Sequence, residues 1–295
     1  MKRAVIDLGT NTFNLLVGEV VNGQFCRIYA DKMSVLLGMG GINQGTITPD
    51  AMERAKDALR HFMFLCYEMD VMEVIGIGTS ALRASDNSSE LIEFAKKELD
   101  LEVKVVSGEE EAKLIYQGVK WLRDFEEDTV IMDIGGGSTE FIHVQNNKPN
   151  KAVSLNVGVS RIYQYLNNPD EFTPEHYDKI NRFLVKNEGG FFESSQSDIL
   201  IGASGSFETL YKLSFQTDFP KDKRTIEVPK KRLDDVIESI LYSSLEDRMA
   251  NTLISPIRKR MLPIAAFKVK WVMDKLATKQ VLISPYSLKE GVFQI

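Results

Sequence analysis

The chain has few of the residues on which most zinc and thiol sites depend. Among its 295 residues only two are cysteines, Cys26 and Cys66, and three are histidines, His61, His143 and His176. Their spacing matches no zinc-binding pattern, and so few cysteines are typical of a reducing compartment. We therefore expect neither a zinc site of histidines and cysteines nor a Ser–His–Asp hydrolase.

Long apolar runs and an excess of positive charge are also missing. No stretch approaches the length of a membrane span, and residues 1–3 lead directly into a strand that Asp7 interrupts. The net charge of −6 argues against general nucleic-acid binding. We therefore expect a cytoplasmic protein that binds neither membranes nor nucleic acid.

Two nucleotide-binding motifs are absent or weak. No Gly-x-x-x-x-Gly-Lys-Ser/Thr loop occurs, which excludes a Walker-type nucleotidase. Residues 76–81 fit the Gly-x-Gly-x-x-Ala dinucleotide pattern, but the similar segment at 202–207 breaks that spacing. A composition of 43% hydrophobic and 26% charged residues is that of an ordinary globular protein, long enough for two domains.

What the sequence does contain is an internal repeat. Asp133 lies 126 residues after Asp7, and each aspartate ends a buried strand followed by a glycine-containing turn. Gly202 and Gly76 are separated by the same 126 residues. The Thr-Pro helix starts at 48 and 173 repeat this order at an offset of 125. The repeat predicts two copies of one α/β unit, with their glycine turns facing each other across a cleft.

The apolar pattern within each copy predicts strands that alternate with helices, which implies a mainly parallel sheet covered by helices. Ligands of such sheets bind at the carboxyl ends of the strands, where these turns lie. The acidic segment 124–128 is the best candidate for a linker. The expected strands are 3–8, 14–21, 32–37, 74–77, 103–106, a hairpin over 129–145, 152–157, 199–201 and 280–283. The expected helices are one from Thr48, 90–99, 109–122, one from Thr173, and a helical region ending near Ala277.

The strongest single motif is the segment from Asp133 to Glu140, which contains three consecutive glycines. Glycines let the backbone approach an anion closely and turn several N–H groups toward it. Ser138 and Thr139 add hydroxyl groups, so the segment favours phosphate binding over a simple hairpin turn. The first copy has Asn11 and Thr12 in its turn but carries Asn14 where the second copy has Glu140, so the halves differ chemically.

Three charged positions suggest catalytic chemistry nearby. Glu109, Glu110 and Glu111 open a helix, and capping accounts for two of them, so one could point into the cleft as a base. Arg83 follows the turn at Gly78 and could bind a phosphate bidentately, although a surface salt bridge is the alternative. Basic residues also cluster at 221–224, 230–232 and 258–260, either as solvated helix ends or as a wall that attracts a polyanion.

These motifs resemble those of the exopolyphosphatase/guanosine pentaphosphate phosphatase family, in its short two-domain form. The resemblance covers most of the chain and is most specific in the segments 107–115 and 133–140. It implies an α/β fold of duplicated actin-like (ribonuclease H-like) domains with a cleft between them. The implied domains are residues 1–124 and 125–285, with residues 286–295 returning to the first domain.

The same resemblance assigns roles to individual residues. It implies Glu111, Asp133 and Glu140 as catalytic residues, with Asp133 and Glu140 also holding Mg²⁺ or another divalent cation such as Mn²⁺. It implies a further set that binds the substrate phosphates: Asn11, Thr12, Arg83, Gly135, Gly136, Gly137, Ser138, Thr139, Gly205 and Ser206.

The implied activity is hydrolysis of a terminal phosphoanhydride of inorganic polyphosphate by metal-assisted attack of water, in a homodimer. Guanosine pentaphosphate 5′-phosphatase is the alternative, followed by an actin-like nucleotide-binding regulator or kinase. One segment departs from the family pattern. The usual Leu-Arg-Glu-Gly follows an Asp/Gly-rich turn, whereas this chain has Ser284-Pro285-Tyr286-Ser287 before Leu288-Lys289-Glu290-Gly291.

Overall fold

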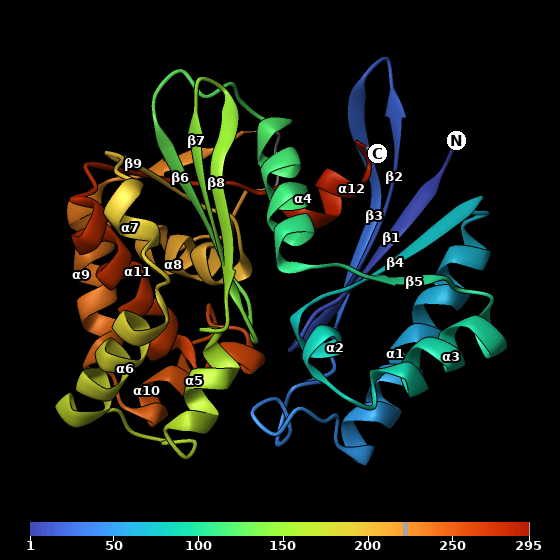
Figure 1. The fold of residues 1–295 in the computed structure, drawn as a ribbon, viewed down its shortest axis with the longest axis horizontal. Coiled ribbons are helices and arrows are strands. Elements are labelled where there is room, and N and C mark those ends of the chain that lie inside the picture. Colours follow the sequence, from blue (N-terminus) through green and yellow to red (C-terminus); the bar gives the residue numbers. More distant parts are fainter. Residues whose placement is uncertain (221–223, 295) are drawn as a thin grey trace.

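The computed structural model describes residues 1–220 and 224–294, which form two α/β units around two mixed sheets (Figure 1). The first sheet has the strand order β3-β2-β1-β4-β5, in which β1 pairs antiparallel with β2 and parallel with β4. Its strands are β1 (Arg3–Leu8), β2 (Thr12–Val21), β3 (Gln24–Ser34), β4 (Glu73–Gly78) and β5 (Val103–Val105).

The second sheet has the order β10-β11-β9-β6-β7-β8, so it repeats the first sheet and adds β10 at one edge. Its strands are β6 (Thr129–Ile134), β7 (Thr139–Gln145), β8 (Lys148–Leu155), β9 (Ile199–Gly202), β10 (Ile226–Val228) and β11 (Gln280–Ile283). The registers repeat as well, because Asp7 lies opposite Asn14 and Asp133 lies opposite Glu140. The predicted duplication and α/β class are therefore confirmed.

Helices cover the outer face of each sheet. On the first unit, α1 (Pro49–Glu68) and α3 (Ser88–Leu99) pack on β1 and β2 to form one apolar core. On the second unit, α6 (Pro174–Asn187), α8 (Gly205–Phe215), α9 (Lys230–Leu241) and α11 (Leu262–Leu276) contribute to a second core. Further short helices are α2 (Ser80–Ala84), α5 (Val159–Tyr165), α7 (Phe191–Ser194) and α10 (Leu245–Ala250). None of the described helices is long and apolar enough to cross a membrane.

A third core lies between the two sheets and contains α4 (Gly108–Lys120) and α12 (Leu288–Val292). The two helices cross with their backbones almost in contact. A Cβ atom on Gly118 would lie 1.9 Å from the Ser287 carbonyl oxygen, and one on Gly291 would lie 1.9 Å from that of Leu114. Because only glycine fits at such a crossing, the last described turn of the chain is fixed against the helix that carries Glu111.

Several details differ from the predicted elements; the strand expected at 152–157, for example, is β8, which begins at Lys148 and ends at Leu155. The strand expected at 32–37 is β3, which begins at Gln24 and ends at Ser34 because it pairs along the whole of β2. Strand β10 was not predicted, since three residues within a mainly helical region give too short a pattern to recognise.

Candidate active site

A cavity of about 430 Å³ lies between the two units, where β1, β4, β6 and β9 end. Both glycine turns and the start of α8 line it, together with acidic side chains from both units. Most of the residues predicted for the site are found in its wall: Asn11, Thr12, Glu111, Asp133, Gly135, Gly136, Gly137, Ser138, Glu140, Gly205 and Ser206.

The two glycine turns meet at the floor of this cavity. A Cβ atom on Gly136 would lie 2.9 Å from both the Asn11 amide and the Thr10 side chain. A Cβ atom on Gly137 would lie 2.5 Å from Ser80 Oγ, which is buried and has no hydrogen-bond partner among the described residues. The floor therefore has no room for side chains on these glycines, and it contains a hydroxyl group left without a partner.

The glycine carbonyl oxygens of the second turn point away from the cavity, toward the first turn of α5. The backbone N···O distances are 3.0 Å for Val159–Gly135, 2.8 Å for Ser160–Gly136 and 3.2 Å for Gly158–Gly137. In a trans peptide the N–H group points opposite to the carbonyl group. The N–H groups of Gly136, Gly137 and Ser138 are thus directed away from α5, and all three residues line the cavity.

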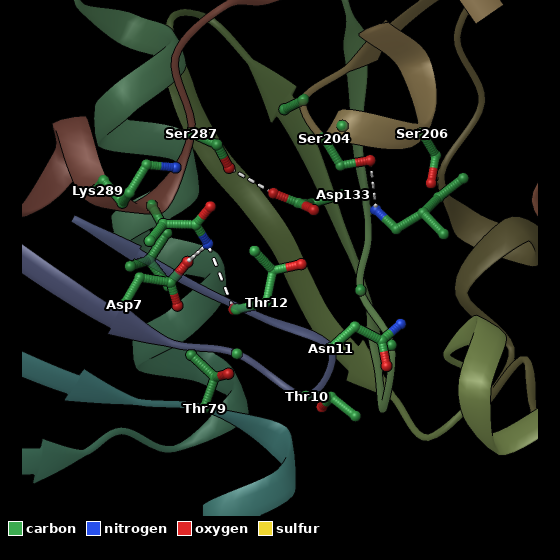
Figure 2. A pocket seen from close by; sticks show the side chains of 18 of the residues that line it. Asp7, Thr10, Asn11, Thr12, Thr79, Asp133, Ser204, Ser206, Ser287 and Lys289 are labelled. Atoms are coloured by element: carbon green, nitrogen blue, oxygen red, sulfur yellow. Dashed lines mark hydrogen bonds between the residues drawn. The ribbon is translucent and has the colours of Figure 1, made fainter. Parts of the chain in front are cut away.

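Asp133 and Glu140 lie side by side on β6 and β7. The Ser287 hydroxyl donates to Asp133 Oδ2 (Figure 2), and the Ser154 hydroxyl donates to Glu140 Oε1 at 2.6 Å. Burial and then the charge of Glu140 raise the pKa of Asp133 to about 8. Burial likewise raises the pKa of Glu140, against the opposing hydrogen bonds from Ser138 and Ser154. The positive side chains around this pair therefore do not offset the cost of burying two carboxylates together.

Glu111 is the one acid of the predicted triplet that reaches the cavity. Its side chain is 9% exposed, and Oε2 accepts a hydrogen bond from Arg83 Nη1 at 2.9 Å. Burial and the charge of Glu140 raise the pKa of Glu111 to about 9, while Arg83 acts in the opposite direction. The carboxylates of Glu111 on α4 and Glu140 on β7 are thus close enough for the charge of Glu140 to raise the pKa of Glu111.

The other two glutamates serve the helix end. Ser107 and Glu110 form a reciprocal capping box, in which the Ser107 N–H donates to Glu110 Oε2 at 2.8 Å and the Glu110 N–H donates to Ser107 Oγ at 3.1 Å. Glu109 is exposed in the same turn. The sequence interpretation that capping accounts for two of the three acids agrees with this arrangement.

Two residues predicted to bind phosphate do not line the cavity. Arg83 lies behind Glu111, where its guanidinium donates to Glu111 and, at 2.8 Å, to the Val106 carbonyl oxygen. Thr139 is fully buried on the opposite face of β7 from Glu140, because neighbouring residues of a strand point to opposite faces. Its hydroxyl accepts from the buried Lys268 ammonium, so its side chain faces the core of the second unit.

The basic clusters divide between the two interpretations given above. Arg258 lines the cavity and packs on the start of α8, where a Cβ atom on Gly205 would lie 1.9 Å from its guanidinium. By contrast, Lys259 donates to the Met249 carbonyl oxygen and Arg260 binds Asp170. Lys221 and Lys223 lie outside the described residues. At 258–260, one basic residue of three thus faces the cleft.

The sequence interpretation missed several cavity residues. Asp7 accepts from the Asn14 side-chain amide at 3.1 Å, and Ser287 and Lys289 enter from α12 and the segment before it (Figure 2). The repeat at Asp7 and Asp133 was a usable signal for Asp7. Ser287 and Lys289 could be recognised in the sequence only as part of a segment that departs from the family pattern, without a position in space.

Known proteins match the chain over nearly its whole length. The profile described as the Ppx/GppA phosphatase family matches residues 16–294. The crystal structure of an exopolyphosphatase from Cytophaga hutchinsonii is 31% identical and has a TM-score of 0.95, covering 100% of this chain and 97% of its own. The PPX-GPPA enzyme of Aquifex aeolicus is 23% identical with a TM-score of 0.82, covering 99% of this chain and 98% of its own, and supports the fold alone.

Proposed function

Because the chain belongs to the Ppx/GppA phosphatase family, we propose that it releases the terminal phosphate of inorganic polyphosphate. The arrangement that carries this proposal is a cavity with glycine N–H groups at its floor and Glu111, Asp133 and Glu140 in its wall. The 31% identity to a protein described as an exopolyphosphatase favours polyphosphate as the substrate. Guanosine pentaphosphate, which carries the same anhydride linkage, is the second candidate.

In the proposed complex the terminal phosphoryl group lies on the glycine turns. The N–H groups of Gly136, Gly137 and Ser138 donate to its oxygens, and Ser80 Oγ supplies a further polar contact from the first unit. Backbone donors fixed before the substrate arrives need no rearrangement as charge shifts during phosphoryl transfer. The hydrogen bonds from α5 to the glycine carbonyl groups hold these donors in place.

Asp133 and Glu140 are suited to hold a divalent cation. Their buried carboxyl groups lie together, and the charge of Glu140 raises the pKa of Asp133, so a cation beside them would relieve this repulsion. Among the described residues no group of three or more acidic, histidine or cysteine side chains is arranged around one metal position. Mg²⁺ commonly accepts one or two carboxylates and completes its shell with water and phosphate oxygens. When bound, such an ion would supply positive charge that neutralises the transferred phosphoryl group.

Glu111 is proposed as the base. A water oxygen forms a bond to the terminal phosphorus while the bond from phosphorus to the bridging oxygen breaks, and the shortened chain leaves with that electron pair. Glu111 accepts the proton of the attacking water in its carboxylate form, which positive charge beside Glu140 would favour against the raised pKa of Glu111. Arg83, hydrogen-bonded to Glu111 at 2.9 Å, fixes the direction of its carboxylate rather than contacting substrate. Burial of Glu111 keeps other water molecules away from it.

The direct test measures phosphate release from long-chain polyphosphate and from guanosine pentaphosphate side by side, with MgCl₂ and with EDTA. We expect Mg²⁺-dependent release from polyphosphate, with a lower kcat/KM for guanosine pentaphosphate. The reverse order of kcat/KM values would select the second candidate. Release from neither substrate by the folded wild-type protein would refute the proposed function.

A further inference from the structure

Among the residues that the structure describes, four positively charged side chains line the cavity, and three of them already have partners. Arg27 pairs with Glu290 at 3.5 Å, and Arg258 donates to Ser255 Oγ at 3.0 Å. Lys32 also has a partner within the protein. Lys289, by contrast, makes no hydrogen bond or ion pair with any residue that the structure describes. Its ammonium group therefore has three donors available toward the cavity.

Lys289 stands on a rigid support. Its helix α12 begins with a capping box between Ser287 and Glu290 and is fixed against α4 by the glycine crossing described above. The neighbouring Leu288 and Val292 are buried in the core between the sheets. The backbone of Lys289 is thus held in place, while its side chain extends into the cavity.

The charges around Lys289 come from both units. Burial alone would lower the pKa of Lys289, but the carboxylates of Glu290, Asp7, Glu208 and Asp133 together raise it above its ordinary value. The group is therefore a stable cation. Figure 2 shows it on the same side of the pocket as Asp7, with Asp133 opposite. No carboxylate holds it in a direct contact among the described residues, so the ammonium can bind an anion without breaking an existing salt bridge.

We propose that Lys289 is a substrate-binding residue that donates to phosphoryl oxygens of the polyphosphate end held on the glycine turns. This inference deepens the proposed function, on which it rests, because it names a contact to the substrate within the same cavity. A cation among several acids would also reduce the repulsion that a polyanion meets on entering. The competing explanation is that Lys289 only balances the charge of Asp7, on which it has the largest charge effect of the neighbouring groups.

The test measures binding by isothermal titration calorimetry in MgCl₂. The probe is diimidotriphosphate, a tripolyphosphate analogue whose NH bridges resist hydrolysis. Lys289→Met should weaken its binding by about 10- to 150-fold, the loss expected for a charge-assisted hydrogen bond. Lys289→Arg should remain within a few-fold of wild type. Lys113→Met removes the same charge from an exposed position on α4 and should change nothing, which makes it the matched control.

Each outcome decides the question. Binding to Lys289→Met within threefold of wild type, or no binding to wild type, overturns the proposal. Thermal unfolding is measured on the same samples, and Lys289→Gln replaces Lys289→Met if the methionine variant does not fold. A lower unfolding temperature with unchanged binding would support the charge-balancing explanation and refute ours. Phosphate release is assayed separately, so a wild-type protein that binds the analogue but hydrolyses neither substrate refutes the proposed function alone.

Discussion

Replacing Glu111 with glutamine tests the proposed chemistry most directly. Glutamine keeps the shape of the side chain and an oxygen that can accept from Arg83, but it cannot accept the proton of the attacking water. A positioned base contributes about 10²–10⁴ in rate, so kcat should fall by that factor. At about 1.36 kcal/mol per decade this is about 2.7–5.4 kcal/mol of activation free energy.

The assay follows phosphate release from polyphosphate under saturating substrate, with KM measured separately. KM should stay the same or fall slightly, since the variant has one negative charge fewer near a polyanion. Glu109→Gln and Glu110→Gln are the controls, because Glu109 is exposed and Glu110 caps α4. Glu110→Gln should keep kcat within a few-fold of wild type, because glutamine at this position can also complete the capping box with Ser107.

The reasoning fails if Glu111→Gln keeps nearly full activity while a neighbouring variant loses it. In that case the buried glutamate beside Arg83 is a structural acid and a different group activates water. Full activity in all three variants would leave Asp133, Glu140 or a bound cation to activate the attacking water.

Three further predictions follow from the same geometry. Arg83→Ala should lower kcat by about tenfold or more with little change in KM, because Arg83 contacts Glu111 and does not line the cavity; a rise in KM alone would instead indicate a phosphate contact. Gly136→Ala should lower kcat by about 100-fold, because its Cβ would lie 2.9 Å from Asn11 and displace the two turns; unchanged kcat in a folded variant would contradict this. In EDTA, the free energy of unfolding should fall between pH 5 and pH 9 in urea titrations. The raised pKa values of Asp133 (about 8) and Glu111 (about 9) mean that the folded state binds more protons than the unfolded state, and Glu111→Gln should flatten this slope.

The duplication and its consequences could be predicted from the sequence because they depend on local patterns. The offset between Asp7 and Asp133 reappears in the strand registers, where Asn14 and Glu140 occupy equivalent positions. The glycine turns were placed correctly, since a turn after a buried strand must lie at the edge of the sheet. The start of α1 after Thr48 agrees with the predicted Thr-Pro signal.

What could not be predicted depends on contacts between distant segments. Arg83 and Glu111 are both charged and both near the cleft, but only the packing of α4 decides that they bind each other. The face on which Thr139 lies depends on the register of β7, and its partner Lys268 is 129 residues away. Ser287 reaches Asp133 across 154 residues, which no local pattern could indicate.

The difference between Asn14 and Glu140 has a consequence for the symmetry of the site. Two identical units would offer a phosphate the same groups from both sides, so the two sides of the site would be equivalent. A neutral amide in one copy and a carboxylate in the other remove that equivalence, although the backbone registers remain the same. A change at one repeated position thus makes the two sides of the site chemically different, with a carboxylate pair on the second unit and an acid–amide pair on the first.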